Sequence, residues 1–240
     1  YNAGGGFYDF PISNSLRFED GDSAYLGFTP SSAGNRKTWT WSGWIKFSNL
    51  AGNLTMLSAG TSAGEKTVVS LYGPNGSIYF ANAVGGVQAN YYQTTRVFRD
   101  PSAWYHIVVA VDTTQSTASN RVKIYANNEL TTNLIAAIPQ NNDTYLNSTS
   151  AHSLGRRTDS NNNYFSGYMA DTCLIDGAAL TPASFGETKN DIWIPKNTSG
   201  LTFGDEGWRL EYKQVGTGTA SSTTIGADTS GNDNHWTSNN

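Results

Sequence analysis

Residues 39–47 read WTWSGWIKF, and large apolar side chains alternate in this segment with small or polar ones. Successive side chains of a strand point to opposite faces, so the segment places one apolar row on a single face. The row consists of Trp39, Trp41, Gly43, Ile45 and Phe47. This alternation is typical of an antiparallel strand with one buried face. It predicts a core built from β-sheet.

Two further segments extend this interpretation. Residues 104–111, WYHIVVAV, are apolar on both faces and flanked by turn-forming residues, which predicts a central strand. Residues 121–126, RVKIYA, run into Asn127 and Asn128, a pair that tolerates the positive φ angles of a tight hairpin, and a return strand is expected toward residues 134–138. The residues predicted to lie in the core are Trp39, Trp41, Ile107, Val109 and Ile124.

The composition argues against a helical protein. Gly, Asn, Ser and Thr make up 101 of the 240 residues, and these types favour turns and strands over helix interiors. The helix expected from the pattern is one short turn at residues 181–186, where a Thr N-cap precedes Pro182 and Gly186 ends the turn. Short strands between frequent turns, without an internal repeat, predict a sandwich or barrel.

Charge and apolar runs limit the partners. The chain has 15 Lys and Arg against 19 Asp and Glu, spread without runs, so we expect no nucleic acid partner and no anionic lipid surface. The longest strongly apolar run, residues 107–111, is far below the roughly 20 residues that span a bilayer, so no membrane insertion is expected. The glycine run at residues 4–6 indicates a linker-like segment, residues 1–14, before a single domain, residues 15–240. We expect the chain to be a fragment or a processed piece.

Catalytic signals are weak. Glu206 and Glu211 are five residues apart, and an odd spacing in a strand sends them to opposite faces. The three histidines lack metal-type spacing or a nucleophile motif, and His106 is interpreted as a buried histidine with satisfied hydrogen bonds. We therefore expect a protein that is not an enzyme. Acidic residues distant in sequence can still meet in space, which leaves hydrolysis as an alternative.

Residues 85–95, 141–150 and 159–163 are rich in Asn and neighbouring tyrosines, and they are predicted to be exposed loops. Tyr91 and Tyr92 are adjacent, so one ring is expected to anchor the segment while the other is exposed. Together with Tyr164, beside Asn161 and Asn163, the exposed ring could stack on a sugar whose hydroxyls the amides bind. The alternative is that both tyrosines only cover the edge of the sandwich.

Asp159, Asn161 and Asn163 occupy positions 1, 3 and 5 of a calcium-type loop. The pattern fails at position 6, which is Tyr164 instead of Gly, and at position 12, which is Ala170 instead of Glu. A polar turn is the favoured interpretation, and no cofactor is expected. Calcium remains possible, with these three residues or Asp228 and Asp233 of a second oxygen-rich turn as ligands.

Several segments together resemble the laminin-G-like or concanavalin A-like jelly-roll family. The resemblance rests on Trp104 and His106 of the central strand, on the basic-apolar segment 121–125, and on residues 154–157 and 165–185. Residues 15–18, 22–26, 39–44 and 231–236 are similar to modules of bacteriophage tail fibres in particular. The resemblance implies an all-β, two-sheet antiparallel jelly-roll sandwich with at most one short helical turn. It also implies a loop rim or concave face that contacts glycans, often with calcium.

Three functions follow from these observations. The leading hypothesis is a non-catalytic virion surface protein, a glycan-binding or receptor-binding module of a phage tail fibre or appendage. It would act outside the cell as a homo-oligomer, with a host-surface glycan or receptor and other virion proteins as partners. The second is an architectural decoration or assembly protein without glycan specificity, and the third is a polysaccharide-degrading enzyme.

Overall fold

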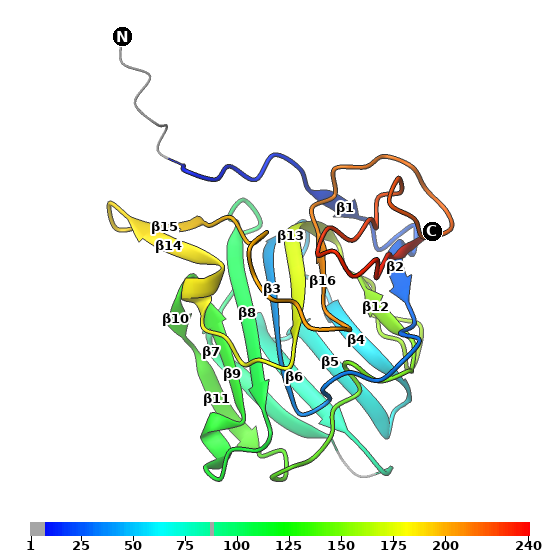
Figure 1. Ribbon diagram of the computed structural model, residues 1–240. Helices are drawn as coiled ribbons and strands as arrows, with labels where there is room; N and C mark the ends of the chain where they lie inside the picture. Colours follow the sequence, from blue (N-terminus) through cyan, green and yellow to red (C-terminus); the bar gives the residue numbers. More distant parts are fainter. Residues whose placement is uncertain (1–7, 87–88) are drawn as a thin grey trace.

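The alternating segment at residues 39–47 forms strand β3 (Thr38–Phe47) in the middle of a seven-stranded antiparallel sheet (Figure 1). The structure is a computed structural model and describes residues 8–86 and 89–240. The glycine run at residues 4–6 lies outside the described residues. The other strands of this sheet are β1 (Leu16–Phe18), β8 (Tyr105–Asp112), β9 (Val122–Ala126), β10 (Glu129–Leu130), β13 (Gly167–Asp176) and β16 (Trp208–Leu210).

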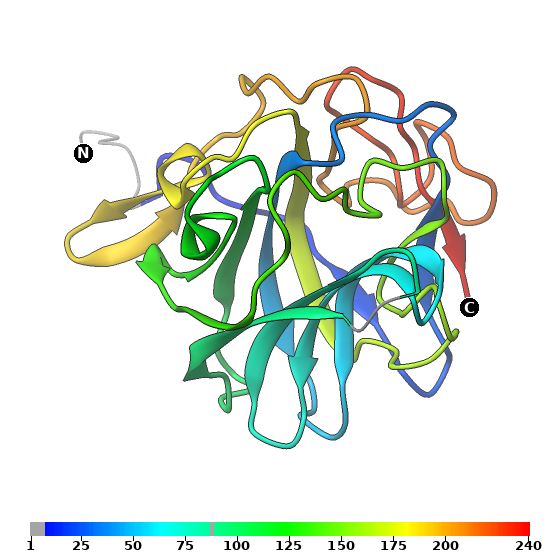
Figure 2. The same ribbon diagram turned by 90° about the horizontal axis from the view of Figure 1, so that it is seen from below.

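The second sheet has eight antiparallel strands and faces the first, as the view from below shows (Figure 2). In spatial order its strands are β11 (Thr132–Ala136), β7 (Asn90–Val97), β6 (Ser77–Ala83), β5 (Glu65–Tyr72), β4 (Leu54–Ser62), β12 (His152–Leu154), β2 (Tyr25–Phe28) and β17 (Thr237–Asn239). The two sheets form the predicted jelly-roll sandwich. A separate hairpin of β14 (Gly186–Lys189) and β15 (Ile192–Pro195) projects from it beside the N-terminal segment (Figure 1).

The core lies between the two sheets, and the predicted parity of β3 is confirmed. Trp39, Trp41, Ile107, Val109 and Ile124 are all fully buried in one cluster. The opposite row of β3, which includes Ser42 and Trp44, points to the outer face of the seven-stranded sheet. The sandwich therefore has one shared interior and two outer faces that can carry binding residues.

The predicted Asn127–Asn128 hairpin is also present. Both residues have positive φ angles, 48° and 72°, and they join β9 to β10. The return strand is only two residues long, because the chain then crosses to the other sheet, where β11 pairs with β7. A short 3₁₀ turn, η2 (Pro182–Ser184), follows Thr181 as expected, although Thr181 makes no side-chain capping bond. A second turn, η1 (Ala118–Asn120), had no signal in the sequence.

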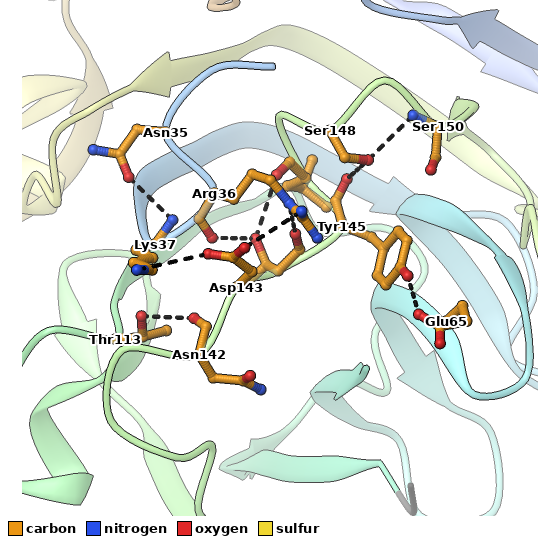
Figure 3. A network of polar contacts seen from close by, with 12 residues as sticks. Asn35, Arg36, Lys37, Glu65, Thr113, Asn142, Asp143, Tyr145, Ser148 and Ser150 are labelled. Atoms are coloured by element: carbon orange, nitrogen blue, oxygen red, sulfur yellow. Dashed lines mark hydrogen bonds and ion pairs between the residues drawn. The ribbon is translucent and has the colours of Figure 1, made fainter. Parts of the chain in front are cut away.

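The loop at residues 141–150 closes one end of the sandwich through a network of polar contacts (Figure 3). The Asp143 carboxylate lies 3.4 Å from Arg36 and 4.0 Å from Lys37. The Tyr145 hydroxyl donates to Glu65 at the start of β5. Because these partners come from two segments distant in sequence, the loop is a structural closure of the sandwich as well as a polar surface.

Candidate functional site

Three tyrosines gather on the outer face of the eight-stranded sheet, and we call Tyr72, Tyr79 and Tyr91 the tyrosine face. They occupy outward positions of β5, β6 and β7, where Ala81 pairs with Tyr91 and Ser70 pairs with Tyr79. The Tyr79 ring lies 5.9 Å from the Tyr91 ring and 6.3 Å from the Tyr72 ring. Tyr79 is buried, whereas Tyr72 and Tyr91 are 40% and 39% exposed. The buried ring thus supports two accessible ones.

A charged cluster borders the tyrosine face. Asp159 accepts a bidentate pair of hydrogen bonds from Arg157, at 2.9 and 2.5 Å, and one from Lys66 at 3.1 Å. Burial alone would raise the pKa of Asp159, but the hydrogen bonds and charges of Arg157 and Lys66 outweigh it, and the pKa is lowered. Burial raises the pKa of Tyr79, whose phenol lies within electrostatic range of Arg157 and Asp159. Two cations surround one anion, so the cluster leaves a positive charge beside the rings.

The loop that carries this cluster is fastened to strand β4. Ser58 Oγ donates to the Arg156 carbonyl, and the Thr55 N–H donates to the Asn163 carbonyl. Asn161 and Asn163 both have a φ of 51°, a left-handed conformation that Asn tolerates. The predicted polar turn is therefore present, with Asn161 exposed and Asn163 half-buried.

The prediction that residues 85–95 form one exposed loop was wrong, because residues 90–97 are strand β7. The alternation of side chains along β7 determines which of the two adjacent tyrosines is exposed. Tyr91 is exposed, whereas Tyr92 is fully buried and packs edge-on against Phe80 at 6.1 Å. The Tyr92 hydroxyl donates to the Ala118 carbonyl and accepts from the Ile138 N–H. Tyr92 is thus an anchor and is removed from the candidate binding residues.

The sequence did not indicate which of the predicted binding residues contact one another in the fold. Within the described residues, no ring or polar contact joins the half-buried Tyr164 to Tyr91. Tyr91 is connected to the loop through the Tyr79 ring, which lies within electrostatic range of Arg157, and neither Tyr79 nor Arg157 was predicted. Strand parity would have found Tyr79 once β6 and β7 were recognised as neighbours, but the sequence carries no signal for their register.

The oxygen-rich turns are occupied by the protein's own donors. Asp228 Oδ1 accepts from the N–H groups of Arg209 and Ser230, and Asp228 Oδ2 accepts from Ser230 Oγ and the Asn234 N–H. Asp233 is exposed and lies 3.6 Å from His235. In the described part of the chain, no group of three His, Cys, Asp or Glu is placed to hold a metal ion. That no metal is needed stays a prediction to be tested, with calcium as its alternative.

One pair of carboxylates distant in sequence does meet. Asp171 and Glu211 both contact Arg209, at 2.9 and 3.2 Å, and with Lys213 they line a small pocket. Burial raises the pKa of Asp171. Burial would also raise that of Glu211, but Lys213 and Arg209 lower it. Carboxyl groups whose pKa values are pushed apart can serve as acid and base, although here both are ion-paired.

Comparison with known families gives one match. The profile of the concanavalin A-like lectin/glucanases superfamily, of the third laminin G type, matches residues 20–184. A search of curated protein sequences finds no match. Across residues 8–86 and 89–240, no helix has both the length and the apolar character needed to cross a bilayer.

Solved structures show the same fold at low sequence identity. A candidate carbohydrate-binding protein from Bacteroides ovatus is 16% identical with a TM-score of 0.60, over 94% of this chain and 58% of that one. A heptameric SAP-like pentraxin from Limulus polyphemus is 16% identical with a TM-score of 0.52, over 70% and 77%. Domains LG4-5 of the mouse laminin alpha1 chain are 8% identical with a TM-score of 0.51, over 83% and 47%. Identities this low establish the fold alone.

Proposed function

This chain belongs to the concanavalin A-like lectin/glucanases superfamily, and on that premise we propose that it is a non-catalytic glycan-binding module. The tyrosine face is the observation that supports this function. Its two exposed rings offer flat apolar surfaces for the faces of a pyranose, and Arg157 and Lys66 beside them offer hydrogen-bond donors for its oxygens. Stacking of this kind contributes about 1 kcal/mol per ring.

The rigidity of the face supports binding as well. Tyr79 holds Tyr72 and Tyr91 from below, and Asp159 holds Arg157 and Lys66 in place. Side chains that are already ordered lose less entropy when a ligand arrives. The loop amides Asn161 and Asn163 would extend the polar border of the site.

We further propose that the module acts at the surface of a virus particle, as part of a phage tail fibre or a related appendage, where it recognises a glycan or receptor on the host cell. Support comes from the resemblance of residues 15–18, 22–26, 39–44 and 231–236 to phage modules. Other virion proteins and further copies of this chain would be its structural partners. Laminin G and lectin-like domains typically act outside the cell, which agrees with this location.

Two alternatives lead to different experimental results. An architectural protein would assemble with its own copies or with a capsid and show no affinity for glycans. A polysaccharide-degrading enzyme is favoured by one observation, the meeting of Asp171 and Glu211 around Arg209. It would release reducing ends from a polysaccharide, and Asp171→Asn would abolish that release.

The test begins with a glycan array probed with the parent protein. Binding to the best glycan is then measured for Tyr91→Ala and for Leu130→Ala, a control at an exposed apolar residue of the other sheet. We expect Tyr91→Ala to bind about fivefold more weakly, the equivalent of about 1 kcal/mol, and the control to bind like the parent. Equal binding by parent and Tyr91→Ala, with unchanged melting curves, would remove the tyrosine face as the site.

A further inference from the structure

We propose that a pocket on the outer face of the seven-stranded sheet, walled by Trp44, Trp104 and Trp193, is a second saccharide site that takes a neutral pyranose unit. It lies on the side of the sandwich opposite the tyrosine face. We call it the tryptophan pocket. Its volume is about 330 Å³, and residues 8–15 line it together with the β14–β15 hairpin seen beside them in Figure 1.

The pocket exists because a small residue lies beside a large one. In the sheet register, Trp44 of β3 pairs with Ala170 of β13 on one side and with His106 of β8 on the other. Ala170 leaves space next to the Trp44 ring, and Trp104, just before β8, borders that space. A pocket of about 300 Å³ lies at the small end of the range that holds ligands. The space therefore fits a small ligand or one unit of a longer one.

The tryptophans are held in fixed orientations. Trp193 Nε1 donates to His106 Nδ1 at 3.0 Å, so the ring proton of neutral His106 lies on Nε2, which donates to Ser42 Oγ at 2.8 Å. The His106 ring also stacks between the Trp44 ring at 4.9 Å and the Trp193 ring at 5.9 Å. His106 is thus a positioning residue that joins two walls of the pocket.

The hairpin and the N-terminal segment complete the walls. The Trp193 ring lies directly against Gly186, where any Cβ atom would collide with it. The segment at residues 8–15 is fastened to the hairpin by the Asp9–Lys189 ion pair at 3.1 Å. Such preorganised walls favour binding because little ordering remains to be done when the ligand enters.

The lining indicates the class of ligand. Among the described residues, no charged side chain lines the pocket, and besides the indoles its polar side chains are Tyr8, Ser13, Asn14 and Ser15. In the described structure, the indole N–H groups of Trp44 and Trp104 donate to no protein acceptor, so they are available to a ligand. Indole faces, free N–H donors, hydroxyls and an amide together match a neutral molecule with apolar faces and many hydroxyls. A neutral pyranose has this chemistry, whereas a hydrocarbon chain would leave the polar groups unpaired.

The proposal can be tested by NMR of the indole N–H signals. The probes are the methyl pyranosides of glucose, galactose, mannose and N-acetylglucosamine, titrated to millimolar concentrations, with glucuronate as a charged comparison. We expect at least one neutral pyranoside to shift the signals of Trp44 and Trp104, and glucuronate to bind more weakly. The proposal fails if no neutral sugar shifts these signals, or if glucuronate shifts them as strongly.

Three variants locate the binding. Trp104→Ala removes a wall that is 38% exposed, and it should weaken binding about tenfold. Gly186→Ala displaces the Trp193 ring while leaving Trp104 in place, and it should weaken binding too. Because it is an independent variant, the test stays decisive if Trp104→Ala lowers the melting temperature of the protein. Ile135→Ala, at 59% exposure on the opposite sheet and outside the tyrosine face, is the matched control and should leave these shifts unchanged.

The two sites can fail separately. If Trp104→Ala abolishes the sugar-induced shift of the Trp44 signal while Tyr91→Ala binds the best array glycan like the parent, the tryptophan pocket stands and the tyrosine face falls. If Tyr91→Ala loses binding to the array glycan while Trp104→Ala and Gly186→Ala keep the full sugar-induced shift of the Trp44 signal, the tyrosine face stands and the tryptophan pocket is refuted.

Discussion

Separate replacement of Trp39 and Trp41 by phenylalanine isolates the contribution of one indole hydrogen bond to the stability of the sandwich. The two residues lie on the same face of β3, and both are fully buried. They differ in one respect. Trp39 Nε1 donates to Thr144 Oγ1 at 2.8 Å, whereas Trp41 Nε1 has no hydrogen-bond partner within the described structure.

The expected losses in the free energy of unfolding follow from this difference. Both replacements remove a similar apolar area and leave a similar cavity, so these terms nearly cancel in the comparison. Trp39→Phe also breaks a buried hydrogen bond that contributes about 1 kcal/mol, whereas Trp41→Phe removes an unpaired donor whose burial costs about 1–3 kcal/mol. We expect Trp39→Phe to destabilise the protein by about 2 kcal/mol more than Trp41→Phe. Complete truncation in Trp41→Ala should cost about 3–5 kcal/mol.

Urea unfolding followed by circular dichroism gives the free energies by linear extrapolation, provided that the slopes of parent and variants agree. Thr144→Val is the control for the hydrogen bond, because it removes the acceptor while keeping Trp39. Thr144→Val also breaks the hydrogen bond that Thr144 Oγ1 donates to the Arg36 carbonyl at 2.7 Å. In the Trp39→Phe background it should therefore cost only that second bond, about 1 kcal/mol, which is less than its cost in the parent. Equal destabilisation by Trp39→Phe and Trp41→Phe would refute the reasoning.

Two further outcomes are expected. Chelation with EDTA should leave the midpoint of thermal unfolding unchanged. Lys66 and Arg157 pair with Asp159, and backbone and hydroxyl donors surround Asp228, so neither carboxylate needs a cation. A lower midpoint that calcium restores would contradict this. Burial lowers the pKa of His106 to about 3 and that of His152 to about 4, while an unfolded histidine has a pKa of about 6.5. Their contribution to stability is present above about pH 6.5 and is lost as the pH falls toward about 4, by about 1.4 kcal/mol per pH unit for each. Urea midpoints that stay constant from about pH 7 to about pH 5 would count against buried neutral histidines.

Local patterns predicted the interior of this protein better than its surface. The alternation in β3 determined which face of Trp39 and Trp41 is buried, because side-chain parity is a property of the strand itself. The same parity correctly implied that only one of Tyr91 and Tyr92 is exposed. The pattern at residues 90–95 nevertheless predicted a loop, because the glycines and amides before the strand outweighed its Thr and Tyr content.

The surface sites depend on register between strands that are distant in sequence. Tyr79 supports Tyr91 only because β6 pairs with β7 in one particular alignment. The tryptophan pocket requires Ala170 to lie beside Trp44 and the β14–β15 hairpin to return over His106. No spacing within the sequence predicts these contacts, because the alternative registers of the paired strands differ in side-chain packing across the whole sheet.

The pairing of the chain's two ends has a consequence for how the protein can be shortened. β1 pairs with one part of β13 and β16 with another, while β17 pairs with β2 at the end of the other sheet. These contacts join the earliest and latest strands, so the sandwich cannot close until most of the chain is present, and slow folding is expected. A fragment that stops before β16 would leave the backbone N–H and C=O groups of β2 and β13 unpaired at open sheet edges. Such a fragment would also lack Trp208, Leu210 and Trp236, which are fully buried in the core, so its aggregation would reflect both open strand edges and an incomplete core.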